Sequence, residues 1–87
     1  MSEDIHPGQL RAARALIGWT REALAEAAGT TTRTLARLEG GETEARSSTA
    51  RAIRRALEAA GVIFIDENGE GPGVRLKKAD GKQDSQL

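Results

Sequence analysis

The sequence predicts a mainly α-helical domain of four helices followed by a short C-terminal β-hairpin. Three observations support this fold class. Apolar residues recur at helical spacing between residues 9 and 61. Glycines stand where the predicted helices should end. The segment "VIFID" (62–66) is then β-branched and aromatic, which favours a strand. The 87 residues of the chain are enough for one small domain.

The first two predicted helices are joined by a short turn. Pro7 suits the first turn of a helix, where its missing N–H costs nothing, and Gly18 ends this helix. Thr20 is a favourable N-cap for a second helix over residues 21–28, "REALAEAA", and Gly29 follows as its left-handed C-terminal residue. In the first helix the apolar residues Leu10, Ala13, Leu16 and Ile17 fall at helical spacing.

The third and fourth helices follow after two polar connections. Thr31 is the expected N-cap of the third helix, in which Leu35 and Leu38 point inward. We expect Ser48 to cap a fourth helix over residues 49–60. Beyond it, "ENGEGPG" has the chemistry of a turn, and "VRLKK" alternates apolar and polar residues as a second strand does.

Composition excludes several classes of protein. The chain has no cysteine, which rules out disulfides and thiolate metal sites. No apolar run approaches the ~20 residues that cross a bilayer, and the acidic N-terminus is not a signal peptide, so we expect a soluble cytoplasmic protein. No nucleophile–histidine–carboxylate set or metal-ligand cluster is present, so we predict no enzyme activity and no cofactor.

Charge is distributed unevenly along a chain whose formal net charge is zero. Residues 9–60 contain nine arginines and six glutamates, a net charge of +3. Arginine forms forked hydrogen bonds with phosphate and guanine. The basic middle of the chain is therefore the candidate surface for nucleic acid.

Two short helices joined by a glycine-containing turn make a helix-turn-helix, and Ala25 is small where the two must approach closely. The stretch "GWTREALAEAAGTTTRTLARLEGGE" resembles the lambda-repressor-like, or XRE-type, transcriptional regulators, and residues 9–61 fit their helical DNA-binding domain. The segment "AIRRALEAAGVIFIDENGEGPGVRL" is similar to small bacterial members that end in a β-hairpin. The implied organisation is a flexible tail (1–8), the DNA-binding domain (9–61), the hairpin (62–78) and a disordered tail (79–87).

The resemblance also implies roles for individual residues. In this family the third helix enters the DNA major groove. Arg21 stands where family members often have glutamine, and arginine there should favour phosphate over base contact. A partly buried ion pair between Arg14 and Glu39 would fix the recognition helix. The expected base-reading residues are Thr32, Arg33 and Arg37, and the expected phosphate contacts are Arg21, Thr31, Thr34 and Arg46.

Simpler interpretations remain open for several of these side chains. Arg33 and Arg37 could be ordinary solvated arginines, and Thr31 a cap and nothing more. Arg54 and Arg55 are expected on a solvated face. Trp19 is expected to pack across the first two helices, and His6 to belong to the tail, with no second ligand near it.

The leading functional hypothesis is a sequence-specific regulator of transcription, a repressor rather than an activator. It would bind a palindromic operator in double-stranded DNA as a homodimer associated with the nucleoid. The hairpin is the candidate dimerisation element through Val62, Ile63, Phe64 and Ile65, unless it folds back on its own helices. The alternative is a protein-interaction module, such as an antitoxin, whose C-terminal segment binds a partner or a second regulatory protein.

Overall fold

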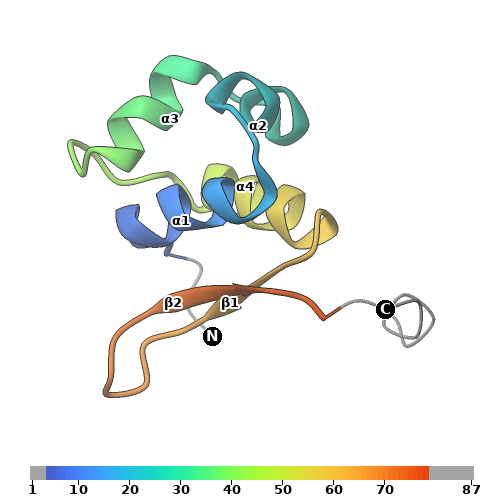
Figure 1. The fold of residues 1–87 in the computed structure, drawn as a ribbon. Helices are drawn as coiled ribbons and strands as arrows, with labels where there is room; N and C mark the ends of the chain where they lie inside the picture. Colours follow the sequence, from blue (N-terminus) through green and yellow to red (C-terminus); the bar gives the residue numbers. More distant parts are fainter. Residues whose placement is uncertain (1–3, 79–87) are drawn as a thin grey trace, which may run out of the picture.

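The computed structural model describes residues 4–78, and this part of the chain is mainly helical, as the sequence predicts (Figure 1). Four helices are followed by two antiparallel strands. No helix among residues 4–78 combines the length and apolar composition that a bilayer crossing requires. The elements in chain order are α1 (Pro7–Ile17), α2 (Arg21–Ala28), α3 (Thr32–Glu39), α4 (Ser47–Ala59), β1 (Val62–Ile65) and β2 (Gly73–Leu76).

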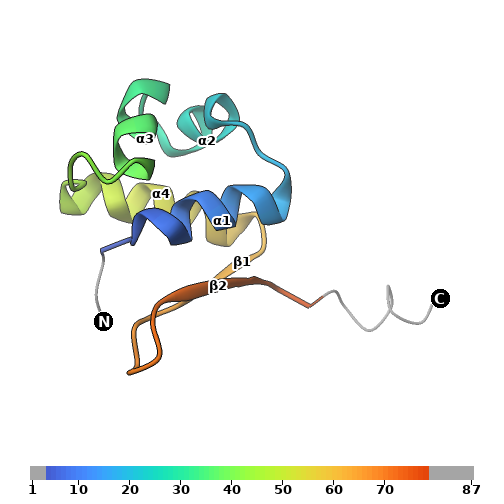
Figure 2. The same ribbon diagram turned by 60° about the vertical axis from the view of Figure 1, so that its left-hand side comes forward.

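The elements form three layers, which both ribbon views show (Figures 1 and 2). Helices α1 and α4 make the middle layer, with α2 and α3 on one side of it and the hairpin on the other. The core lies between these layers and includes Leu24, Leu35, Ile53 and Leu57, each at most 1% exposed. The outer face of the hairpin is therefore turned away from α3.

The helix-turn-helix has the predicted caps. The Thr20 hydroxyl accepts a hydrogen bond from the Ala23 N–H at 3.0 Å, and the Thr31 hydroxyl accepts one from the Thr34 N–H at 3.1 Å. Gly29 ends α2 at a φ of 71°, in the left-handed region that favours glycine. These local signals fix the turn between α2 and α3.

Helix α4 begins earlier than predicted, and Ser48 is not its N-cap. The helix starts at Ser47, and Arg46 occupies the cap position without a side-chain hydrogen bond. Ala50 is 3% exposed and its N–H donates to the Arg46 carbonyl at 2.8 Å. Packing of Ala50 against the core therefore sets the first turn in place of a serine cap.

Helix α1 begins at Pro7, the residue expected in its first turn, and therefore overlaps residues 1–8, which we expected to be a flexible tail. His6 is its N-cap: the Nδ1 atom accepts from the Gly8 N–H at 3.0 Å, and the His6 N–H donates to Gln9 Oε1 at 2.9 Å. Ile5 packs against the core. His6 and the residues beside it thus belong to the folded domain, while residues 1–3 lie outside the described residues.

The hairpin packs against the helices of its own chain. Val62 is 2% exposed and Phe64 9%. Phe64 pairs with Val74, which also packs on the core. The side-chain amide of Gln9 donates to the carbonyls at the ends of both strands, Ile65 at 3.2 Å and Gly73 at 3.0 Å. These contacts fasten β1 and β2 to α1.

Arg54 fastens the other side of the hairpin to α4. Its guanidinium lies over the Phe64 ring, 4.9 Å from the centroid, and pairs with Glu58 at 3.1 Å and Asp66 at 3.5 Å. Only 14% of the Arg54 side chain is exposed. The expectation of a solvated face is therefore wrong for Arg54, because the hairpin covers it, while Arg55 is exposed as expected.

Only two of the four hairpin residues predicted to form the dimer contact remain accessible at the surface. Val62 and Phe64 are inside their own domain and cannot serve as an exposed contact, which corrects the expectation for these two residues. Ile63 and Ile65 alternate with them along β1 and are partly exposed. The free tail that the antitoxin alternative requires does not include β1 and β2, and residues 79–87 lie outside the described residues.

Candidate nucleic-acid interface

The first turns of α2 and α3 meet along a shallow surface groove. Its lining includes Thr20 and Arg21 from the start of α2, and Thr32 and Arg33 from the start of α3. Each helix N-terminus presents backbone N–H groups and a partial positive charge. The groove therefore combines arginines, hydroxyls and helix dipoles, which attract an anion, with one carboxylate, that of Glu22.

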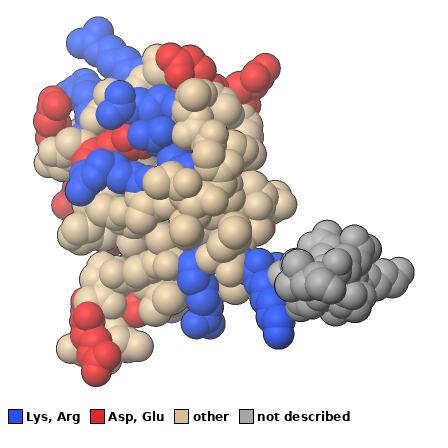
Figure 3. All heavy atoms as spheres, viewed as in Figure 1, with Lys and Arg blue, Asp and Glu red and all other residues tan. Residues whose placement is uncertain are grey.

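Helix α3 has one buried face and one polar face. Leu35 is fully buried and Leu38 is 7% exposed, so they anchor the helix in the core. On the other face, Arg33 and Arg37 are exposed, and Thr32 beside them is half-buried. Figure 3 shows several basic side chains, with acidic ones among them, over the part of the molecule where α3 lies. The helix thus presents two long cationic side chains to solvent.

The threonines at the start of α3 have different roles. Besides capping the helix, the Thr31 hydroxyl forms a hydrogen bond with the Thr34 hydroxyl, at 3.0 Å. Because Thr31 then donates to Thr34, the Thr34 hydroxyl proton remains able to donate outward. Thr31 is therefore mainly a structural residue, and the Thr34 hydroxyl remains available as a donor.

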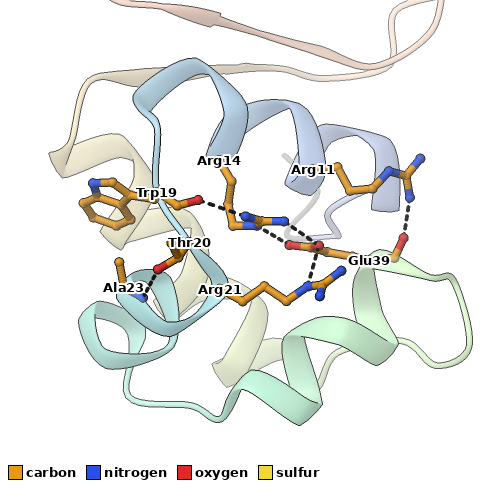
Figure 4. Close-up of polar contacts among 7 residues, drawn as sticks. All are labelled: Arg11, Arg14, Trp19, Thr20, Arg21, Ala23 and Glu39. Atoms are coloured by element: carbon orange, nitrogen blue, oxygen red, sulfur yellow. Dashed lines mark hydrogen bonds and ion pairs between the residues drawn. The ribbon is translucent and has the colours of Figure 1, made fainter.

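Glu39, at the C-terminal end of α3, is the centre of a polar junction between three helices (Figure 4). Arg14 from α1 donates to both carboxylate oxygens, through Nε at 2.5 Å and Nη2 at 2.9 Å. Arg21 from α2 donates through Nε at 3.0 Å. Arg11 donates to the Glu39 backbone carbonyl, and Arg14 Nη1 also donates to the Trp19 carbonyl at 2.8 Å.

The arginines of this junction offset the burial of the Glu39 carboxylate. Burial of the Glu39 carboxylate favours its neutral form, but the hydrogen bonds from Arg14 and Arg21 outweigh burial and lower its pKa. The hydrogen bond to Glu39 in turn raises the pKa of Arg14. The Glu39 side chain is 1% exposed, so its charge depends on these partners. The junction sets the position of α3 relative to α1 and α2.

The structure brings some of the expected residues together and separates others. Arg21, Thr32 and Arg33 line one groove. Arg37 lies in the last turn of α3, and Arg46 is exposed at the start of α4. The Arg14–Glu39 ion pair is present.

Sequence reasoning missed two contacts of the junction, namely the bond from Arg11 and the one from Arg21 to Glu39. The spacing of Arg11 and Arg14, three residues apart on one helix, is a signal that the two share a face. No feature of the sequence indicates that Arg21 bonds to Glu39. That contact depends on how α2 crosses α3.

Comparison with known protein families gives a match over most of this region. A helix-turn-helix family model matches residues 10–59, which span α1 to α4. The match covers more than half of the chain and includes the groove and the Glu39 junction. No curated protein matches the chain significantly.

Proposed function

Because the chain belongs to the XRE-type helix-turn-helix family of DNA-binding regulators, we propose that it binds specific sequences in double-stranded DNA through α3 and represses transcription in the bacterial nucleoid. The observation that carries this proposal is the groove that Arg21, Thr32 and Arg33 line together. A helix whose exposed face carries arginines suits the major groove, where guanine O6 and N7 accept a forked guanidinium.

The roles of individual residues follow from their surroundings. Arg33 and Arg37 are exposed and, within residues 4–78, have no polar partner on their side chains, so base reading by them breaks no internal bond. Thr32 assists from the first turn of α3. Arg21 and Thr34 bond to DNA phosphates beside the groove, with Thr31 as the cap that orders this turn and Arg46 as an outlying phosphate contact.

We propose that the protein acts as a homodimer on a palindromic operator. One recognition helix reads few base pairs, whereas two helices about 34 Å apart read two half-sites on one face of the duplex. Both α3 helices must then face the same DNA. The position of the hairpin opposite α3 supports protomers that lie side by side, because contact between outer hairpin faces would turn the two α3 helices in opposite directions.

Pairing of the exposed edge of β1 with its copy is the contact that keeps both α3 helices on one side, and Ile63 and Ile65, on the outer face of β1, flank that edge. They are partly exposed, and the cross-strand partner of Ile63 is the exposed Arg75. Their replacement by threonine keeps β-branching and replaces the ethyl group of each side chain with a hydroxyl. In analytical ultracentrifugation, the double variant should be monomeric at concentrations where the wild-type protein is dimeric. A monomeric wild-type protein on its DNA would contradict the dimer proposal.

Selection from a random duplex library, followed by binding measurements on the Arg33→Ala variant, tests the function. Wild-type protein should enrich a palindromic motif. Arg33→Ala should lose discrimination at one base pair per half-site, at a cost of about 1–3 kcal/mol. The matched control is Arg55→Ala, an exposed arginine on α4. Equal loss of affinity on selected and unrelated DNA would contradict base reading by Arg33.

A further inference from the structure

Arg21 is held by only one of its three nitrogen atoms. Its Nε donates to Glu39 Oε1 at 3.0 Å, and within residues 4–78 its side chain makes no other polar contact. The Arg21 side chain is 46% exposed, whereas that of Glu39 is 1% exposed. The guanidinium is therefore attached at its inner edge, and its two Nη groups are left for another acceptor.

Glu39 is itself fixed, so this attachment is rigid. Arg14 binds both oxygens of the Glu39 carboxylate from α1, and Arg11 binds the backbone carbonyl of the same residue. The carboxylate cannot rotate without breaking the bonds to Arg14. A planar guanidinium bonded to a fixed carboxylate loses much of its rotational freedom before any ligand arrives.

From this geometry we propose that Glu39 is a positioning residue for DNA binding, in addition to being part of a structural ion pair. It holds the guanidinium of Arg21 so that the Nη groups point to the phosphate that lies along the groove between α2 and α3. The proposal rests on the function proposed above, because it requires a DNA phosphate at this groove. Preorganisation reduces the entropy lost when that phosphate binds.

The proposal distinguishes arginine from lysine at position 21. Arginine can donate Nε to Glu39 and both Nη groups to a phosphate at the same time. Lysine carries the same charge on one nitrogen, at the end of a flexible chain. In the Arg21→Lys variant, the single ammonium can bond either to Glu39 or to the DNA. If it bonds to Glu39, it is not available to the phosphate. If it bonds to the phosphate, the Glu39 carboxylate keeps only its bonds to Arg14.

The test is an anisotropy titration of a labelled DNA duplex of fixed mixed sequence between about 50 and 200 mM KCl, where the salt slope reports the number of phosphates neutralised. The variants are Arg21→Lys and Arg21→Ala. Arg55→Lys is the matched control, because Arg55 is an exposed arginine on α4 without a polar side-chain partner among residues 4–78. In the free protein, NMR exchange of the Arg21 Nε proton measures the bond to Glu39 directly.

We expect Arg21→Lys to weaken binding nearly as much as Arg21→Ala and to reduce the salt slope by about 0.9 per protomer. Arg55→Lys should keep the wild-type affinity and slope, and the Arg21 Nε proton should exchange slowly. If Arg21→Lys keeps both the affinity and the slope of wild type, the positioning role is wrong, but DNA binding stands. A wild-type protein that does not bind the duplex at low salt overturns the proposed function and this inference together.

The double variant Arg21→Ala/Glu39→Gln separates positioning from folding. Glu39→Gln should reduce the salt slope when Arg21 is present and leave it unchanged when Arg21 is alanine, provided that circular dichroism shows both proteins folded at the assay temperature. A purely structural Glu39 would weaken binding equally in both backgrounds, and that result would contradict the inference.

Discussion

Replacement of Arg14 by alanine tests the physical reasoning about the Glu39 junction most directly. Arg14 supplies two hydrogen bonds to a carboxylate that is 1% exposed. Removal of one partner from a buried ion pair costs about 3–5 kcal/mol, because the remaining charge loses its compensation. Arg21 keeps one hydrogen bond to Glu39 in the variant, so we expect the lower end of this range, about 3 kcal/mol.

This loss is large compared with the stability of so small a domain. Globular proteins gain about 0.05–0.15 kcal/mol per residue, which gives about 4–13 kcal/mol for 87 residues. Arg14→Ala should therefore lower the urea midpoint by about 1–3 M, at a typical dependence of about 1–3 kcal/mol per molar urea. The single tryptophan, Trp19, gives the fluorescence signal, and its carbonyl accepts a hydrogen bond from Arg14.

Arg33→Ala is the matched control for the urea experiment, because Arg33 is exposed and has no polar side-chain partner among residues 4–78. Its free energy of unfolding should stay within about 0.5 kcal/mol of wild type. If Arg14→Ala also stayed within about 0.5 kcal/mol, Glu39 would be adequately solvated or adequately paired by Arg21. Arg14 would then not be required for the stability of the Glu39 junction.

The pH dependence of the Arg14→Ala effect gives a second measurement. The folded-state pKa of Glu39 is lowered, so its ion pairs stabilise the fold fully above the unfolded-state pKa and lose this effect as pH falls through the folded-state pKa. The difference in unfolding free energy between wild type and Arg14→Ala should therefore shrink below about pH 5. A constant difference across the acid range would show that the effect is packing alone.

Three further variants test individual elements. Thr31→Ala should lower the melting temperature by removing the cap of α3, at a cost of about 1 kcal/mol, and Thr31→Ser should restore it. Phe64→Ala should cost about 3 kcal/mol in urea unfolding, because it leaves a cavity under the hairpin. It should also speed amide exchange at Val74, the cross-strand partner of Phe64. Unchanged exchange would argue against the packing of the hairpin on the helices. Gly29→Ala should cost about 1–2 kcal/mol in thermal unfolding, from a φ of 71° alone, since nothing lies within 4 Å of the added Cβ.

Local chemistry accounts for the predictions that agree with the structure. Thr20 and Thr31 are caps because a short hydroxyl side chain satisfies exposed N–H groups at a helix start, wherever that helix later packs. Gly29 is left-handed because glycine has no Cβ to oppose that conformation. The predictions for Ser48 and His6 are wrong because cap position also depends on tertiary packing, in which Ala50 is buried and Ile5 packs on the core.

The amino-acid sequence by itself determined the helices, their turns, the helix-turn-helix family and the exposure of Arg33 and Arg37, since periodicity and capping act over a few residues. Only the tertiary structure decided that Arg21 shares a carboxylate with Arg14, and that the hairpin covers its own core on the side away from α3. Those outcomes depend on how distant elements cross and which apolar faces they bury, and no local spacing encodes these contacts.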